Sequence, residues 1–204
     1  MPPKFIYFDL GRVILNFDVA QMCRQVAEAT GVEPAVVMQT VIEGPLQRDF
    51  ETGRLSPREF HEEFCRLTET CAEYDLFTRA GSDIFTVNTS MLPVVAGIQA
   101  AGYRTGVLSN TCQTHWEHCL RQFRILQGFS VRALSYEIGA MTPDPAIYQA
   151  AAELAGVEPH EVFFTDDLAE NVAGAREAGF DAVQYTSTPE LVRELRCRGV
   201  RFNY

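Results

Sequence analysis

The stretch Phe5–Ile14 constrains the fold of this chain more than any other. It reads Phe-Ile-Tyr-Phe-Asp-Leu-Gly-Arg-Val-Ile, so an apolar run precedes one carboxylate and apolar residues return after Gly11. A short apolar run bounded by a turn signal is typical of a strand that is buried on both faces of a sheet. Open α/β sheets bind their ligands at the carboxyl ends of the strands, where Asp9 stands. Asp9 is therefore the first candidate for chemistry.

From Met91 onward, short apolar runs alternate with helical patterns of ten to twelve residues. The runs that predict strands are Tyr103–Leu108, Phe129–Leu134, Val162–Phe164 and Ala182–Tyr185. This alternation is typical of a parallel sheet with helices on both faces. We therefore expect an α/β fold with a Rossmann-like, doubly wound parallel sheet.

Residues 16–90 show a different pattern, in which helical signals follow one another and no strand is expected. Capping residues and proline at first-turn positions support four predicted helices. These helices span about Asp18–Gly31, Pro34–Ile42, Ser56–Cys71 and Tyr74–Phe85. Roughly 75 residues are too many for a simple crossover between strands. We predict an inserted helical cap at residues 16–90 and an α/β core formed by residues 1–15 and 91–204.

Polar residues stand at the carboxyl ends of three predicted strands. Asp9 ends the first, Ser109 and Asn110 follow the second, and Asp166 and Asp167 follow a later one. Parallel strands bring these ends to one edge, so the side chains should lie close together. Clustered carboxylates repel one another unless a cation intervenes, and Mg²⁺ suits carboxylates together with a phosphate. Ser109, Asn110 and the amides of the following helix could hold an oxyanion.

Four segments, taken together, carry a recognisable pattern: Phe8–Val13, Leu108–Thr111, Pro143–Tyr148 and Phe163–Asn171. In order and spacing they resemble the four motifs of the haloacid dehalogenase-like (HAD) hydrolases, and the resemblance covers essentially the whole chain. The insertion after the first motif looks like a type-one cap. Within it, Glu51–Ser56 resembles the cap of the sugar-phosphate phosphatase branch.

The resemblance implies roles for these residues. Asp9 would attack phosphorus and carry an aspartyl-phosphate intermediate. Mg²⁺ would be bound by the Asp9 carboxylate, the Gly11 carbonyl and Asp166, with Asp167 close by. Ser109 would hydrogen-bond the transferring phosphoryl group, with help from the Asn110 amide. Cap residues would select the leaving group, and closure of the cap would exclude water.

One departure from the family pattern concerns acid–base catalysis. Most HAD phosphatases have a second Asp two residues after the nucleophile, where this chain has Gly11. A branch similar to glucose-phosphate phosphatases also has Asp-Leu-Gly here, so activity need not be lost. General acid–base help contributes about 10²–10⁴-fold, so its absence suggests a good leaving group or a replacement residue.

A second departure concerns positive charge. Thr142 stands where the family has a lysine, and Lys4, the only lysine, precedes the first strand at the opposite edge of the sheet. Arg12 is the nearest candidate replacement and could pair with Asp9, Asp167 or a phosphate. The alternative is that Arg12 points to solvent or to the cap. His115 and His118 are interpreted as surface or core residues rather than as bases.

Three functions therefore remain open. The first is a Mg²⁺-dependent phosphatase, a phosphoric monoester hydrolase acting on a small phosphorylated metabolite with reduced or specialised activity. The second is a catalytically silent relative that binds a phosphorylated ligand or a protein partner, which Gly11 and Thr142 together favour. The third is a 2-haloacid dehalogenase, which uses the same aspartate without a metal. It is the least favoured, because the adjacent Asp166 and Asp167 indicate a metal site.

Composition indicates which classes of partner and which cellular compartment to expect. A net charge of -10 without a basic cluster argues against a nucleic-acid partner. No apolar run approaches the roughly 20 residues that span a bilayer, so we expect no membrane partner. Six scattered cysteines without a CxxC pair and the absence of a leader are typical of a reduced, cytoplasmic protein. We expect a monomer or a homodimer.

Overall fold

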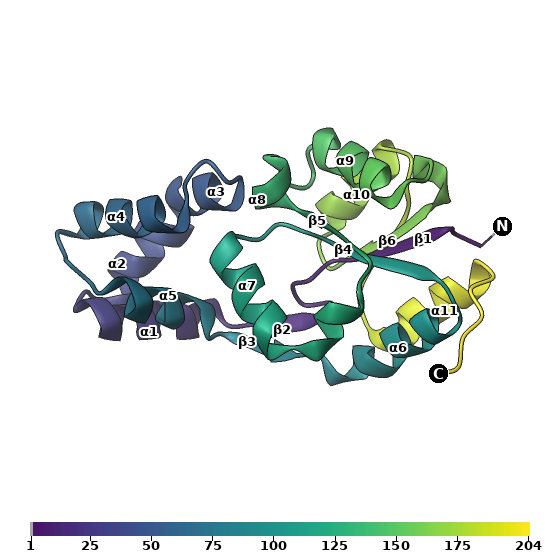
Figure 1. The fold of residues 1–204 in the computed structure, drawn as a ribbon, viewed down its shortest axis with the longest axis horizontal. Coiled ribbons are helices and arrows are strands. Elements are labelled where there is room, and N and C mark those ends of the chain that lie inside the picture. Colours follow the sequence, from purple (N-terminus) through teal and green to yellow (C-terminus); the bar gives the residue numbers. More distant parts are fainter. Residues whose placement is uncertain (1) are drawn as a thin grey trace.

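A five-stranded parallel sheet organises the structure, a computed structural model that describes residues 2–204 (Figure 1). Its strand order is β5-β4-β1-β6-β7. The strands are β1 (Phe5–Phe8), β4 (Arg104–Ser109), β5 (Val131–Leu134), β6 (Val162–Asp166) and β7 (Asp181–Gln184). The expected α/β, doubly wound fold is confirmed, and β1, the strand predicted first, lies at its centre.

β1 pairs with β4 on one side and with β6 on the other, and all four of its residues are buried. Its side chains alternate between the two faces. Ile6 and Phe8 belong to one hydrophobic cluster, whereas Phe5 and Tyr7 belong to another. This double burial explains why the strand reads as an unbroken apolar run.

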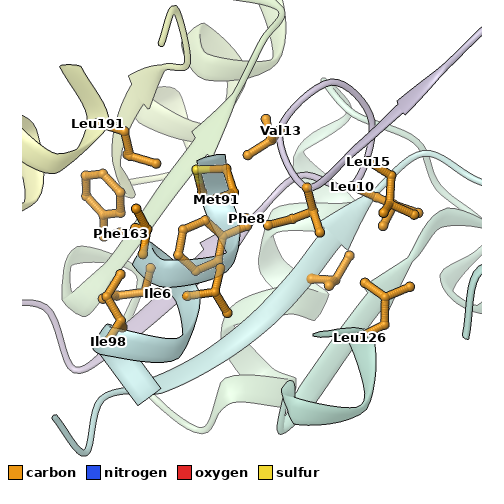
Figure 2. Packing of buried hydrophobic residues seen from close by; sticks show 14 of the residues in the cluster. Ile6, Phe8, Leu10, Val13, Leu15, Met91, Ile98, Leu126, Phe163 and Leu191 are labelled. Atoms are coloured by element: carbon orange, nitrogen blue, oxygen red, sulfur yellow. The ribbon is translucent and has the colours of Figure 1, made fainter. Parts of the chain in front are cut away.

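Helices cover both faces of the sheet (Figure 1). The Ile6 face is covered by α6 (Leu92–Ala100), α7 (Gln113–Gln122) and α11 (Thr188–Cys197). Figure 2 shows residues of this cluster, among them Ile6, Phe8, Met91 and Ile98. The Tyr7 face is covered by α9 (Pro145–Ala155) and α10 (Ala169–Glu177). Short helical turns at Thr89–Met91, Arg124–Gly128, Ser135–Ile138 (α8) and Pro159–Glu161 complete the connections.

A group of helices, the helical lobe, occupies Val19–Ser82 and lies at one end of the molecule (Figure 1). It consists of α1 (Val19–Thr30), α2 (Pro34–Val37), a π-helical turn (Met38–Ile42), α3 (Leu46–Glu51), α4 (Pro57–Thr68) and α5 (Tyr74–Ser82). Asp18 caps α1 and Ser56 opens α4 with a capping box, as expected. The lobe has its own hydrophobic cluster, which includes Met22, Phe64 and Phe77. That residues 16–90 act as a cap stays a prediction.

The expectation of no strand in residues 16–90 was wrong. Two short strands pair antiparallel at the points where the chain enters and leaves the lobe. They are β2 (Leu15–Phe17) and β3 (Phe85–Val87). Each strand has three residues, which is too short for a period-two pattern, and the pairing spans about 70 residues of sequence.

Several helix boundaries also differ from the prediction. The last lobe helix ends at Ser82, because β3 takes over Phe85. The helix expected over Pro34–Ile42 changes to π-helical geometry at Met38. The short helices α3 and α8 were not predicted at all. Across residues 2–204, none of the helices combines the length and apolar character that a membrane span requires.

Candidate active site

The order of the strands places the predicted site residues together. Asp9 directly follows β1, and its N–H donates to the Thr165 carbonyl of β6 at 2.9 Å, which extends the strand pairing by one residue. Ser109 and Asp166 end the two flanking strands. Carboxylate oxygens of Asp9, Asp166 and Asp167 lie within 4.8 Å of one another. The predicted convergence of three carboxylates and a hydroxyl at one sheet edge is therefore what the fold produces.

Burial makes this cluster electrostatically unfavourable. Asp9 is 8% exposed and Asp166 is 2% exposed. Burial raises the pKa of Asp9 well above its usual range, and the neighbouring Asp166 raises it further, whereas a hydrogen bond from Ser109 opposes the shift. Burial likewise raises the pKa of Asp166 to about 6. Neither Asp9 nor Asp166 has a positively charged partner among the described residues, since Arg12 pairs only with Asp167.

Asp166 is fixed in place by hydrogen bonds to each of its oxygens. The Leu168 N–H donates to Oδ1 at 2.7 Å and the Asn171 side chain donates to Oδ2 at 3.0 Å. These bonds partly offset the effect of burial on its pKa. Because the oxygens of the cluster all lie within a few ångströms, Asp9, Asp166 and Asp167 fit a hard divalent cation by both donor chemistry and charge.

The Asn110 side chain is engaged in hydrogen bonds with the protein backbone. Its side-chain amide donates to the Thr142 carbonyl at 3.1 Å, and the Thr142 N–H donates to its Oδ1 at 2.8 Å. This pair of hydrogen bonds joins the end of β4 to the loop before Pro143. Only the Asn110 backbone amide therefore remains for the predicted oxyanion contact, since its side chain positions Thr142.

Arg12 lies beside the cluster but on its solvent side. Its Nε is 3.8 Å from Asp167 Oδ2, its guanidinium lies 5.4 Å from the centre of the Phe17 ring, and its side chain is 64% exposed. It opposes the upward shift that burial imposes on the pKa of Asp167. Of the three pairings predicted for Arg12, the structure contains the one with Asp167.

The sequence pattern of the haloacid dehalogenase-like hydrolases matches residues 37–179, which is more than half of the chain. The chain belongs to this family. The match begins inside the helical lobe and extends through the Asp166–Asp167 strand end, so it includes two of the three strand ends that form the site.

Relatives and solved structures extend the likeness to the rest of the HAD hydrolase chain. D-ribitol-5-phosphate phosphatase from Bacteroides thetaiotaomicron is 24% identical over 94% of this chain and 96% of its own. The chain spans 39%, 15% and 42% of the length of three other curated relatives.

Two solved structures share the fold. A HAD-like hydrolase from Porphyromonas gingivalis aligns with a TM-score of 0.83 at 23% identity, covering 96% of this chain and 99% of its own. A HAD enzyme from B. thetaiotaomicron, in complex with magnesium and inorganic phosphate, aligns with a TM-score of 0.76 at 24% identity, covering 89% and 93%.

The structure shows what surrounds Gly11 and Thr142, the two positions at which the chain departs from the HAD pattern. A side chain at Gly11 would begin 3.0 Å from the Phe17 ring, so the usual second Asp needs that ring to move. Thr142 is 7% exposed and no lysine approaches it, because Lys4 pairs with Glu161 before β6, at the amino end of the sheet. The charge that this HAD hydrolase lacks at position 142 is therefore not supplied by Lys4.

Sequence reasoning missed the polar residues of the helical lobe that face the site. Gln47 and Glu51, on the unpredicted helix α3, line one cavity together with Gly11 and Ser109. His115, interpreted as a surface or core residue, lines the same cavity. The resemblance of Glu51–Ser56 to a family cap was the one sequence signal that pointed to this region.

Proposed function

We propose that this HAD hydrolase is a Mg²⁺-dependent phosphatase that hydrolyses a small phosphorylated metabolite through an aspartyl-phosphate on Asp9. The observation that carries the proposal is the cluster of Asp9, Asp166 and Asp167 beside Ser109 at the carboxyl edge of the sheet. The ribitol phosphatase relative and the HAD structure with magnesium and phosphate support the same chemistry.

In this proposal Asp9, the Gly11 carbonyl and Asp166 hold Mg²⁺, with Asp167 next to them. Bound Mg²⁺ neutralises carboxylate and phosphate charge and polarises the phosphoryl group. The Gly11 carbonyl already accepts a 2.6 Å hydrogen bond from the Val13 N–H, which fixes its direction and leaves its second lone pair.

The chain's own residues carry the two chemical steps. A carboxylate oxygen of Asp9 forms a bond to phosphorus while the bond to the leaving-group oxygen breaks. That oxygen leaves as an alcohol after it takes a proton from water, because Gly11 stands where the family's acid–base Asp would supply the proton. Water then attacks the same phosphorus, which restores the Asp9 carboxylate and releases phosphate. The Ser109 hydroxyl donates to a phosphoryl oxygen in both steps, and the lobe excludes bulk water as a cap.

Phosphate release from a panel of sugar, polyol and nucleotide phosphates tests this function. We expect turnover with Mg²⁺, little turnover in EDTA, and loss to background in Asp9→Asn, which keeps the shape of the side chain but removes the nucleophile. Ser130→Ala is the control, because Ser130 precedes β5 at the amino end of the sheet, away from the carboxyl ends that form the site. A wild-type protein that turns over no phosphate ester in Mg²⁺ contradicts the proposal.

The second candidate is a silent relative that binds a phosphorylated ligand or a protein partner. The observation that favours it is the absence of an acid–base side chain at Gly11, where the Phe17 ring lies close, together with the missing charge at Thr142. Dehalogenation stays the least favoured function, and chloride release from chloroacetate tests it. Cytoplasmic location and a monomeric or homodimeric state stay predictions.

A further inference from the structure

Arg12 has a backbone conformation that arginine rarely adopts. Its φ is 56°, and within residues 2–204 the only other non-glycine residue with positive φ is Glu69, at the end of α4, where a left-handed residue is common. Arg12 stands instead in the tight turn after Asp9, where its N–H donates to the Leu15 carbonyl at 2.6 Å. Glycine or asparagine would fit this turn with less strain. The strain therefore points to a role for the arginine side chain.

The rest of the protein makes little use of the Arg12 side chain. Its Nε lies 3.8 Å from Asp167 Oδ2, which is longer than a hydrogen bond, and among the described residues its guanidinium donates no hydrogen bond. An exposed ion pair of this kind contributes little to stability. A guanidinium carries five N–H donors in a fork that matches phosphate oxygens. Arg12 thus brings unengaged donors and a positive charge to the edge of the carboxylate cluster.

Phe17 supports the Arg12 side chain and also lies against Gly11. The guanidinium is 5.4 Å from the centre of the Phe17 ring, a distance typical of a cation–π contact. A Cβ at Gly11 would lie 3.0 Å from the same ring, and Phe17, Gly11 and Ser109 line one cavity. The absence of a side chain at Gly11 therefore leaves room for the ring on which Arg12 lies.

Arg12 and Ser109 lie on opposite sides of Asp9. The strand order places β4, which ends at Ser109, on one side of β1, and β6, which Asp167 follows, on the other. Because the Arg12 side chain contacts Asp167, its guanidinium lies on the β6 side. The Ser109 hydroxyl and the Arg12 guanidinium therefore flank the proposed nucleophile.

Two other arginines lie near position 142 but outside the cavity beside the nucleophile. Arg48 and Arg54 line a separate groove together with Thr142 and Glu51, and neither lines the cavity at the sheet edge. Arg54 is paired with Asp49 at 3.1 Å, whereas Arg48 has no ion pair within residues 2–204. Arg48 is therefore the alternative source of positive charge.

We propose that Arg12 is a catalytic residue that supplies the positive charge missing at position 142, by leaving Asp167 and binding the phosphoryl group of the substrate. This inference rests on the proposed phosphatase function. The exchange is possible because the contact with Asp167 is long and exposed. Arg12 forms no covalent bond: its N–H groups donate to phosphoryl oxygens while Asp9 attacks, and the Phe17 ring supports the guanidinium.

Arg12→Asn tests this role, because asparagine tolerates the left-handed conformation and the change removes only the charged side chain. We expect kcat/KM for p-nitrophenyl phosphate in Mg²⁺ to fall about 10- to 100-fold, somewhat below the usual effect of one electrostatic contact because the side chain is exposed. Arg104→Asn is the matched control, because Arg104 also lies over a ring, that of Phe5, but at the amino end of the sheet. It should leave kcat/KM unchanged. A fall in Arg12→Asn that is accounted for by a lower urea midpoint would assign Arg12 a structural role and overturn the inference.

Lysine at position 142 distinguishes a replaced charge from two independent effects. If Arg12 supplies the missing charge, Thr142→Lys should raise kcat/KM about tenfold more in the Arg12→Asn background than in wild type, because lysine then restores a charge that Arg12 no longer supplies. Equal gains in the two backgrounds overturn the inference. A loss in Arg48→Asn that exceeds the loss in Arg12→Asn also overturns it, because the charge then comes from the lobe.

Binding of inorganic phosphate, measured by calorimetry in Mg²⁺, separates this inference from the phosphatase function. The Kd should be about tenfold higher for Arg12→Asn than for wild type, and unchanged for Arg104→Asn. If no ester is turned over, the phosphatase function fails, and this difference in Kd alone decides whether Arg12 binds phosphate. Equal Kd values, or no binding to wild type, then overturn the inference. If wild type and Arg12→Asn hydrolyse esters at equal rates, the inference fails and the phosphatase function stands.

Discussion

The sheet edge and the helical lobe hold their polar side chains in different ways. At the sheet edge, Asp9, Ser109 and Asp166 end or directly follow strands with buried neighbours on both sides. In the lobe, Glu51 is the last residue of the six-residue helix α3, and Gln47 is its one hydrogen-bond partner among the described residues. The side chains of the proposed chemistry are therefore held by paired strands, whereas Glu51 is held by one short helix.

The two regions also differ in how their charges are balanced. The sheet edge gathers carboxylates of one sign, so that burial and mutual repulsion both raise the pKa of Asp9. In the lobe, Glu51 faces His115, and each moderates the effect of burial on the other's pKa. Because Arg12 reaches only Asp167, the buried Asp9 and Asp166 still need a cation from outside the chain, whereas Glu51 and His115 partly compensate each other.

Replacing Asp166 with Asn should give the largest effect, and one that depends on pH. The folded-state pKa of Asp166 is raised from 3.8 to about 6, so its ionised form destabilises the fold as pH rises through this range. A shift of roughly two pKa units corresponds to about 3 kcal/mol. In EDTA, the stability of wild type relative to Asp166→Asn should therefore fall by about 3 kcal/mol between about pH 4 and pH 7.

Urea unfolding at a series of pH values measures this difference. Mg²⁺ should restore the stability of the wild type near neutral pH and act much less on Asp166→Asn, because a bound cation favours the ionised carboxylate. Parallel pH profiles of the two proteins in EDTA would show that burial does not raise the pKa of Asp166 in the folded protein.

Replacing Thr142 with lysine tests whether the sheet edge lacks only one charge. The side chain would extend from the loop that Asn110 holds next to the site. We expect phosphate release to rise by about 10- to 100-fold, somewhat below the usual value of one electrostatic contact because Thr142 is buried. Thr142→Met has similar length without charge and should give no gain. A wild type that is already fast, with no gain from lysine, would show that another cation does this work.

The same contrast explains which site residues could be predicted from the sequence. Asp9, Ser109 and Asp166 were found because a buried strand leaves an apolar run in the sequence, and parallel strands bring their ends together. Glu51 and His115 were not found, because they lie about 64 residues apart in sequence and meet only through the packing of the lobe against the core. The pairing of β2 with β3 was missed for the same reason, since it depends on contacts that no local pattern records.

Gly53→Ala should have the smallest of the three effects, and one confined to the lobe. Gly53 has φ of 68°, and an added Cβ would overlap the Tyr136 carbonyl of α8, which holds the loop after Glu51 against the core. Gly31→Ala is the matched control, because Gly31 has φ of 79° with no atom near its Cβ. Gly31→Ala should lose about 1 kcal/mol of stability through backbone strain alone, and Gly53→Ala should lose more, because its Cβ also overlaps the Tyr136 carbonyl. Gly53→Ala alone should also speed hydrogen exchange in α3, because its Cβ pushes against α8, with exchange in β1 unchanged. Equal behaviour of the two variants would mean that the close approach of Gly53 to Tyr136 does not hold α3 against the core.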